Sequence, residues 1–294
     1  IHINTHLINE YIDYESDCLN QNVSPWSGGS RVLPNGLLSP TTPLVAFIIL
    51  TTALLSYFFI YTEGLELYLC LAILFFSISY SLPPFRFSGR GLGEVTVLLV
   101  LDFMFPLLGY LHQFKGASME YLKDNETRNL LMYTCFTMAT VQFSRMMVMN
   151  YKDLEADKAV GKKTLVVILG LESSNKLQIT VNMFSYIWPV LFYNKVPLLL
   201  ILLFLGTAPL NLWIEYRLYN QEWRDDDKFY HIPFWASLYS GLVSFLMLLG
   251  VEISYHSEFF KLHSFPLYLY LLATCFLLYK MKRKSIHLEK VKSK

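Results

Sequence analysis

Apolar runs of about 20 residues recur along the whole chain, and they constrain its fold more than any other feature. A run of this length crosses the hydrocarbon core of a bilayer as a helix. Backbone polar groups inside lipid must pair within the protein, so the sequence predicts an all-α, polytopic transmembrane helix bundle. We count eight such runs, at residues 44–62, 67–82, 95–113, 129–149, 174–193, 197–216, 232–250 and 264–281.

The composition supports a membrane protein and excludes several other classes. Hydrophobic residues make up 54% of the chain and charged residues only 16%, so apolar side chains exceed what one soluble core absorbs. A net charge of +1 argues against nucleic acid as a partner, because that role needs a basic surface. The four cysteines lie far apart, so we predict no disulfide framework, and we predict no zinc or haem site.

Lys and Arg are unevenly distributed between alternate predicted loops. One set of loops carries 18 of these residues, and the other set carries 5. Cytoplasmic loops carry the basic excess in membrane proteins. We therefore expect an integral, multi-pass protein in which residues 1–43, the loop after residue 149 and the C-terminal tail all face the cytoplasm.

Two D-x-x-x-D motifs lie in the predicted cytoplasmic loops, each with an asparagine shortly before it. On a helix, residues four apart share a face, so the two carboxylates of each motif point the same way. Four predicted spans separate the motifs, and this even number brings both to the same membrane face, where topology permits one shared site. The residues are Asn9, Asp13 and Asp17 in the first motif, and Asn150, Asp153 and Asp157 in the second.

Carboxylates clustered at a membrane boundary predict a cation site. They repel one another unless a cation holds them together, and Mg²⁺ combines carboxylate ligands with phosphate oxygens. Bound between two carboxylate walls, Mg²⁺ would neutralise the leaving group of an allylic diphosphate as its C–O bond breaks. The alternative is a set of acidic residues on solvated loops. The predicted catalytic and metal-ligating residues are Asp13, Asp17, Asp153 and Asp157.

These motifs resemble those of the UbiA superfamily of intramembrane prenyltransferases, which carries N-D-x-x-D-x-x-x-D and a later D-x-x-x-D. The segment 150–170, NYKDLEADKAVGKKTLVVILG, is most similar to the MenA-type branch, which prenylates 1,4-dihydroxy-2-naphthoate in menaquinone biosynthesis. Segments 28–40 and 80–94 resemble loops of the same branch. Two positions depart from the pattern, since Glu10 replaces the usual Asp and Met149 replaces the first of two Asn.

The resemblance implies one prenyltransferase membrane domain over residues 1–294. Family members have two helices up to the first motif, whereas this chain starts near the end of the second. Conversely, four predicted spans follow the second motif where a nine-helix plan has three. We therefore expect a domain that is incomplete at its N-terminal side.

Basic residues in the motif loops are candidate contacts for a diphosphate. Arg31 and Lys152 are two of them, with a purely topological role as the alternative. Lys162 is the third, because Gly161 allows the chain to turn back toward a phosphate; otherwise Lys162 and Lys163 form a solvated basic pair.

One arginine lies inside a predicted span. Arg145 precedes Asp153 by eight residues and shares its helix face, so we predict that it binds substrate. The alternative is a side chain that extends to the membrane interface. We expect the two motif asparagines to orient the aspartates. The predicted substrate-binding residues are Asn9, Arg31, Arg145, Asn150, Lys152 and Lys162.

The sequence thus predicts a Mg²⁺-dependent enzyme that transfers a polyprenyl group from an allylic diphosphate to an acceptor in the bilayer. The resemblance implies an aromatic quinone precursor as the acceptor. One alternative is a UbiA-type terpene cyclase, in which the cation attacks its own chain. The other is a non-catalytic membrane protein that binds prenyl lipids.

Overall fold

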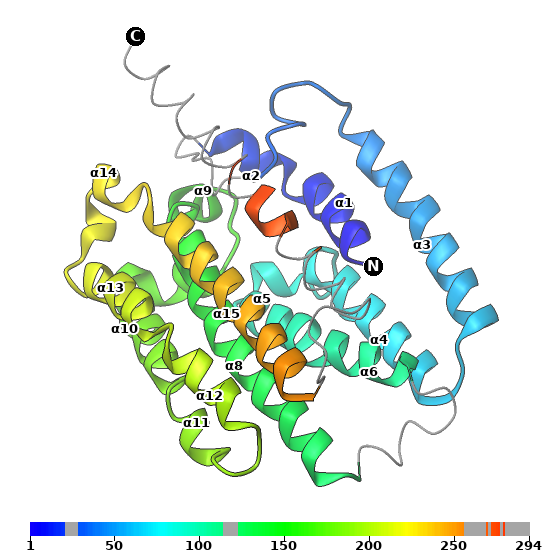
Figure 1. Cartoon of the computed structure of the whole chain (residues 1–294). Helices are drawn as coiled ribbons and strands as arrows, with labels where there is room; N and C mark the ends of the chain where they lie inside the picture. Colours follow the sequence, from blue (N-terminus) through cyan, green and yellow to red (C-terminus); the bar gives the residue numbers. More distant parts are fainter. Residues whose placement is uncertain (21–28, 114–122, 256–268, 270–271, 277–278, 280–294) are drawn as a thin grey trace. The chain divides into compact units, whose positions relative to one another are not determined.

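The computed structural model describes residues 1–20, 29–113, 123–255, 269, 272–276 and 279 of the chain. These residues form helices and the turns between them, with no named strand in the described ranges (Figure 1). They group into two compact units, which are described separately. The described residues before 125 and residues 150–174 form the first unit, and the others form the second. The predicted all-α membrane bundle is confirmed.

Five helical segments in the described ranges are long and apolar enough to cross a membrane. They correspond to five of the eight predicted spans. The predicted span 129–149 lies in one helix, whereas 174–193 covers the end of another helix, a turn and a short helix, and polar residues make both less apolar. Most of 264–281 lies outside the described residues. The five segments are Thr41–Tyr61, Gly64–Ser81, Gly93–Gln113, Leu198–Tyr219 and Asp226–Tyr255.

The first unit is built around a hairpin of two long apolar helices, α3 (Thr41–Tyr61) and α4 (Gly64–Ser81) (Figure 1). The helix α1 (His2–Ile12) packs against both. Phe58 of α3 and Cys70 and Leu74 of α4 form a buried apolar cluster between the hairpin arms. The other elements of the first unit are α2 (Tyr14–Leu19), η1 (Phe87–Gly89), α5 (Gly93–Val97), η2 (Leu98–Met104), α6 (Phe105–Gln113), α9 (Leu154–Ala159) and the start of α10 (Leu165–Phe184).

The span Gly93–Gln113 contains a wide π-helical turn, η2. Pro106 follows this turn, near the start of α6. Proline has no backbone N–H to donate, and in an α-helix its ring clashes with the carbonyl four residues earlier, here that of Asp102. The wider turn before Pro106 relieves this clash and lets one span continue across the proline.

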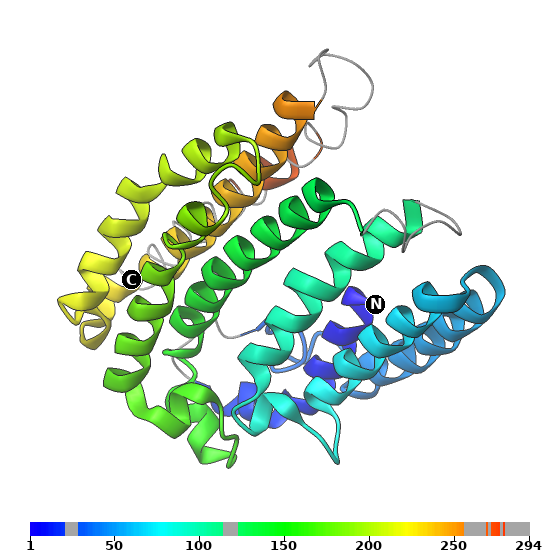
Figure 2. The same cartoon turned by 90° about the horizontal axis from the view of Figure 1, so that it is seen from below.

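In the second unit the long helix α15 (Ile232–Tyr255) packs along α12 (Leu198–Leu205) and α13 (Ala208–Tyr219) (Figure 2). Gly250 is where α15 and α12 approach closely, since a Cβ added there would lie 2.6 Å from Leu200 Cδ2. The remaining elements are α8 (Asn125–Asn150), the rest of α10, α11 (Trp188–Leu191), η3 (Glu222–Arg224) and α14 (Asp226–Phe229).

A buried layer of polar side chains links α8, α10 and α13 in this unit. Asn182 donates to Asn211 Oδ1 at 2.7 Å, and Gln178 donates to Glu215 Oε1 at 2.8 Å. Ser144 on α8 accepts from Gln178 at 2.6 Å. These five side chains are all at least nine-tenths buried, so helices of low apolarity are joined by hydrogen bonds to one another.

The Gly250 contact predicts a stability effect. A leucine at this position overpacks the α12–α15 interface, because Leu200 is fully buried and has no free volume to enter. We expect Gly250→Leu to lower the free energy of unfolding by about 1–3 kcal/mol in detergent, seen as a lower thermal midpoint. The control is Gly109→Leu in α6, where an added Cβ meets nothing within 4 Å. Equal midpoints for the two variants would contradict the prediction.

Candidate functional site

The first motif lies where α1 ends and α2 begins. Asp13 is the junction residue, and helical hydrogen bonding continues through it, since Asp13 N donates to Asn9 O and Asp17 N donates to Asp13 O, each at 2.8 Å. Ser16 Oγ adds a bond to Asp13 O at 2.9 Å. Asn9, Asp13 and Asp17 therefore follow one another at four-residue spacing along nearly continuous helix, as their sequence pattern predicts.

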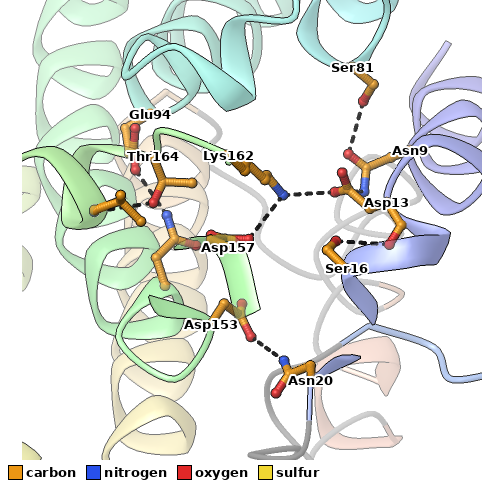
Figure 3. A network of polar contacts seen from close by, with 12 residues as sticks. Asn9, Asp13, Ser16, Asn20, Ser81, Glu94, Asp153, Asp157, Lys162 and Thr164 are labelled. Atoms are coloured by element: carbon orange, nitrogen blue, oxygen red, sulfur yellow. Dashed lines mark hydrogen bonds and ion pairs between the residues drawn. The ribbon is translucent and has the colours of Figure 1, made fainter. Parts of the chain in front are cut away.

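Asn9 connects the first motif to the end of α4. Its Oδ1 accepts a hydrogen bond from Ser81 Oγ at 2.9 Å, and its Nδ2 donates to Asp13 Oδ2 at 3.1 Å (Figure 3). The asparagine therefore contacts the first aspartate and is itself held by a serine from another helix. Its predicted orienting role has a geometric basis in these two bonds.

The second motif is followed by a sharp reversal of the chain. Asp157 lies in the short helix α9, and Lys162 N returns to donate to Asp157 O at 2.8 Å. Gly161 makes the reversal possible, because its φ of +68° lies in the left-handed region that favours glycine. Lys163 N then bonds Gly89 O at 3.0 Å, which fixes the loop against the segment after α4.

The reversal directs the side chain of Lys162 between the two motifs (Figure 3). Its ammonium lies 2.9 Å from Asp13 Oδ2 and 3.6 Å from Asp157 Oδ1. The three side chains are only 13%, 10% and 7% exposed, in the order Lys162, Asp13, Asp157. Burial opposes the ammonium charge, but the two carboxylates outweigh it and hold the pKa of Lys162 above its usual range.

A hydrogen bond at Asp153, about one helical turn before Asp157, also joins the two motifs. Asn20, at the end of α2, donates to Asp153 Oδ1 at 2.8 Å (Figure 3). The contacts between α2 and α9 thus bring Asp153 and Asp157 to the element that carries Asp17. Burial, together with the charge of Asp157, raises the pKa of Asp153 to about 6.

Asp17 lies in a region of excess negative charge. Burial, followed by the carboxylates of Asp13 and Glu10, raises its pKa to about 7. A Cβ added at Gly29 would lie 3.1 Å from Asp17 Oδ2, so the small residue leaves room beside this carboxylate. The guanidinium of Arg31 donates to the main-chain oxygen of Asp17, not to its carboxylate.

The donor chemistry of the four aspartates fits Mg²⁺. Carboxylate oxygens are hard ligands, and burial together with the neighbouring carboxylates of Asp13 and Glu10 raises the pKa of Asp17. In the described ranges, however, no three Asp, Glu, His or Cys side chains converge closely enough to hold an ion. The side chain of Lys162 stands between Asp13 and Asp157 instead. The four aspartates supply carboxylate oxygens of the kind that Mg²⁺ binds, and the ammonium of Lys162 lies between Asp13 and Asp157.

The other predicted substrate-binding residues make different contacts. Asn150 Nδ2 donates to Glu94 Oε1 at 2.9 Å, and so bonds a buried glutamate of α5 in place of an aspartate of its own motif. Lys152 is partly exposed before α9. Arg145 belongs to the second unit, where its Nε donates to Gln142 Oε1 at 3.1 Å.

Four polar residues of this region were not among the predicted site residues. Thr164 hydrogen-bonds the Asp157 carboxylate, and the contacts of the others are given above. Asn20 has a sequence signal, since it follows Asp17 by three residues and continues the face of the first motif. The partners of Ser81 and Glu94 are distant along the chain, and spacing gives no indication of them. The four residues are Asn20, Ser81, Glu94 and Thr164.

Comparison with known proteins places the chain in a family. The model of the UbiA prenyltransferase family matches residues 1–238, and the chain belongs to this family. The chain is also 30% identical over 172 residues to a digeranylgeranylglyceryl phosphate synthase of Thermococcus sibiricus. That match covers 58% of this chain and 53% of the relative, so the chain spans about half the length of the curated relative it matches. No solved structure matches it.

The turn at Gly161 generates a prediction about Lys162. Gly161→Ala and Gly64→Ala each place a side chain at positive φ with nothing within 4 Å, so each should cost about 1 kcal/mol of unfolding free energy. Only Gly161→Ala disturbs the turn that directs Lys162. We expect it to weaken binding of inorganic pyrophosphate with Mg²⁺ by about tenfold, as measured by titration calorimetry in detergent. Equal pyrophosphate affinity in the two variants would count against this role for the turn.

Proposed function

We propose that this protein transfers a polyprenyl group from an allylic prenyl diphosphate to an acceptor in the membrane, with Mg²⁺ at the aspartate site. The observation that carries the proposal is the joining of the two motifs by Lys162, which lies 2.9 Å from Asp13 and 3.6 Å from Asp157. Family membership and the prenyl-transferring relative support the same chemistry. An arrangement that gathers aspartates from both motifs suits a multiply charged diphosphate bound through a divalent cation.

The chain's own residues have distinct tasks in this reaction. Asp13, Asp17, Asp153 and Asp157 would hold Mg²⁺, which when bound supplies positive charge for the diphosphate leaving group. Asn9 keeps Asp13 in place through its bond to the Asp13 carboxylate. Arg31 and Lys162 supply further positive charge toward diphosphate oxygens, and this lowers the energy of the anion that leaves.

The acceptor we propose is an aromatic quinone precursor of the kind used in menaquinone biosynthesis. The support is the similarity of segments 28–40, 80–94 and 150–170 to the MenA-type branch. The relative is named for a different product, a glyceryl phosphate that carries two geranylgeranyl groups. Product analysis with an aromatic quinone precursor and with a prenylated glyceryl phosphate therefore tests which acceptor the protein uses.

We also propose that the aspartate site and the C-terminal tail face the cytoplasm. The support is the concentration of Lys and Arg in the loops on one side of the predicted spans. The polyprenyl chain then lies in the bilayer while its diphosphate remains at the cytoplasmic boundary, which suits an amphipathic substrate.

The catalytic proposal predicts the effect of removing one carboxylate. Asp153→Asn keeps the shape of the side chain but removes a metal-ligating charge, so prenyl transfer from geranylgeranyl diphosphate should fall about a hundredfold or more. The matched control is Glu155→Gln, which removes one charge from the same motif at a side chain that is 72% exposed and paired with Lys158. We expect Glu155→Gln to keep most of the activity.

Product analysis distinguishes the outcomes of this assay. A prenylated naphthoquinol formed from 1,4-dihydroxy-2-naphthoate supports the aromatic acceptor. A lipid formed from a singly prenylated glyceryl phosphate would contradict the aromatic acceptor and identify a glyceryl phosphate in its place. A hydrocarbon released without any acceptor identifies a terpene cyclase. The catalytic proposal fails if no allylic diphosphate is consumed, or if Asp153→Asn is as active as Glu155→Gln.

The orientation predicts which side of the membrane reaches Cys18. Its side chain is exposed next to Asp17, whereas Cys70 and Cys135 are buried. In a Cys275→Ser background, which removes the other exposed cysteine, a membrane-impermeant maleimide should label inside-out vesicles and not sealed right-side-out vesicles. Labelling from the external face would place the aspartate site on the opposite side.

A further inference from the structure

Lys162 occupies space that a cation bound jointly by Asp13 and Asp157 would need. The ammonium contacts one oxygen of each carboxylate, at 2.9 Å and 3.6 Å (Figure 3). An ammonium and a divalent cation at such distances repel each other strongly, because little water screens charges in a largely buried site. Both cations cannot hold these two oxygens at once. The ammonium must therefore move away before these two oxygens can hold a metal ion together.

Hydrogen bonds fix the backbone of Lys162, whereas its side chain is a flexible stem. The backbone is held by the bond from Lys162 N to Asp157 O at 2.8 Å and the bond from Lys163 N to Gly89 O at 3.0 Å. The lysine side chain is a flexible four-carbon stem with a rotatable donor group at its end. Rotation about this stem frees the carboxylates and leaves the ammonium beside the same site.

We propose that Lys162 is a displaceable internal cation of the aspartate site. It joins the two motifs in the metal-free protein, competes with a divalent cation that arrives alone, and turns to a diphosphate oxygen when metal and diphosphate are bound together. This inference rests on the proposed function, because it assumes that metal and diphosphate share this site. Its consequence is that metal binding and diphosphate binding strengthen each other through one side chain.

The test measures the Mn²⁺ affinity of the full chain in detergent by equilibrium dialysis, which counts only the Mn²⁺ that the protein retains in excess of the Mn²⁺ bound to pyrophosphate on both sides. Wild type, Lys162→Met and Lys158→Met are compared with and without inorganic pyrophosphate. Lys158→Met is the matched control, since it removes a lysine from the same segment whose ammonium is paired at 3.1 Å with the exposed Glu155.

Without pyrophosphate, we expect Lys162→Met to bind Mn²⁺ about tenfold more tightly than wild type, because the competing ammonium is gone. With pyrophosphate, Lys162→Met lacks the charge-assisted hydrogen bond from the ammonium to a diphosphate oxygen. The factor by which pyrophosphate increases Mn²⁺ affinity should therefore be about tenfold or more smaller in Lys162→Met than in wild type. Lys158→Met should match wild type in both conditions. The readout is a binding constant and does not depend on turnover.

Unchanged or weaker Mn²⁺ binding by Lys162→Met, without pyrophosphate, overturns the inference. If Lys162→Met does not fold, Lys162→Gln replaces it, because the glutamine amide can still bond the carboxylates without a charge. Lys162→Gln should then also bind Mn²⁺ more tightly than wild type. Lys162→Arg keeps a competing cation and should bind Mn²⁺ like wild type. Wild type that binds no Mn²⁺ even with pyrophosphate would overturn the proposed metal site as well, which separates that failure from failure of the lysine's role.

Discussion

The mutual repulsion of carboxylates at a membrane boundary is the constraint on which the arrangement of this site depends. Four motif aspartates and Glu10 come from two distant parts of the chain, and the first unit draws them together only with the ammonium of Lys162 between Asp13 and Asp157. The helix junction at Asp13, the turn at Gly161 and the bond from Asn20 to Asp153 all serve this gathering. The excess negative charge that remains is what makes the site suited to a cation.

The helical fold and the meeting of the two motifs could both be predicted from the sequence, for simple geometric reasons. Apolar runs of membrane length become helices, and four-residue spacing places carboxylates on one helix face. Gly161 made Lys162 a candidate, but the sequence alone did not separate it from Lys163, because two adjacent lysines have the same chemistry. The direction of the backbone after Gly161 decides which of them enters the site.

Residues whose partners lie on other elements were beyond sequence reasoning. Ser81 holds Asn9 from the end of α4, and Glu94 takes the bond of Asn150 that was expected to serve the aspartates. The predicted spans 129–149 and 174–193 show a related limit. Their polar residues look unfavourable in lipid when each helix is read alone, and only the packed unit shows that they bond one another.

The buried polar layer of the second unit has a consequence for how these helices enter a bilayer. Gln178, Asn182 and Glu215 form hydrogen bonds with side chains of neighbouring helices, and a single helix placed in hydrocarbon would lose these bonds. Such a helix is poorly stable as a solitary span. We therefore expect the membrane insertion of α8 and α10 to depend on their packing with each other and with α13, whose segment Leu198–Tyr219 is apolar enough to cross a membrane.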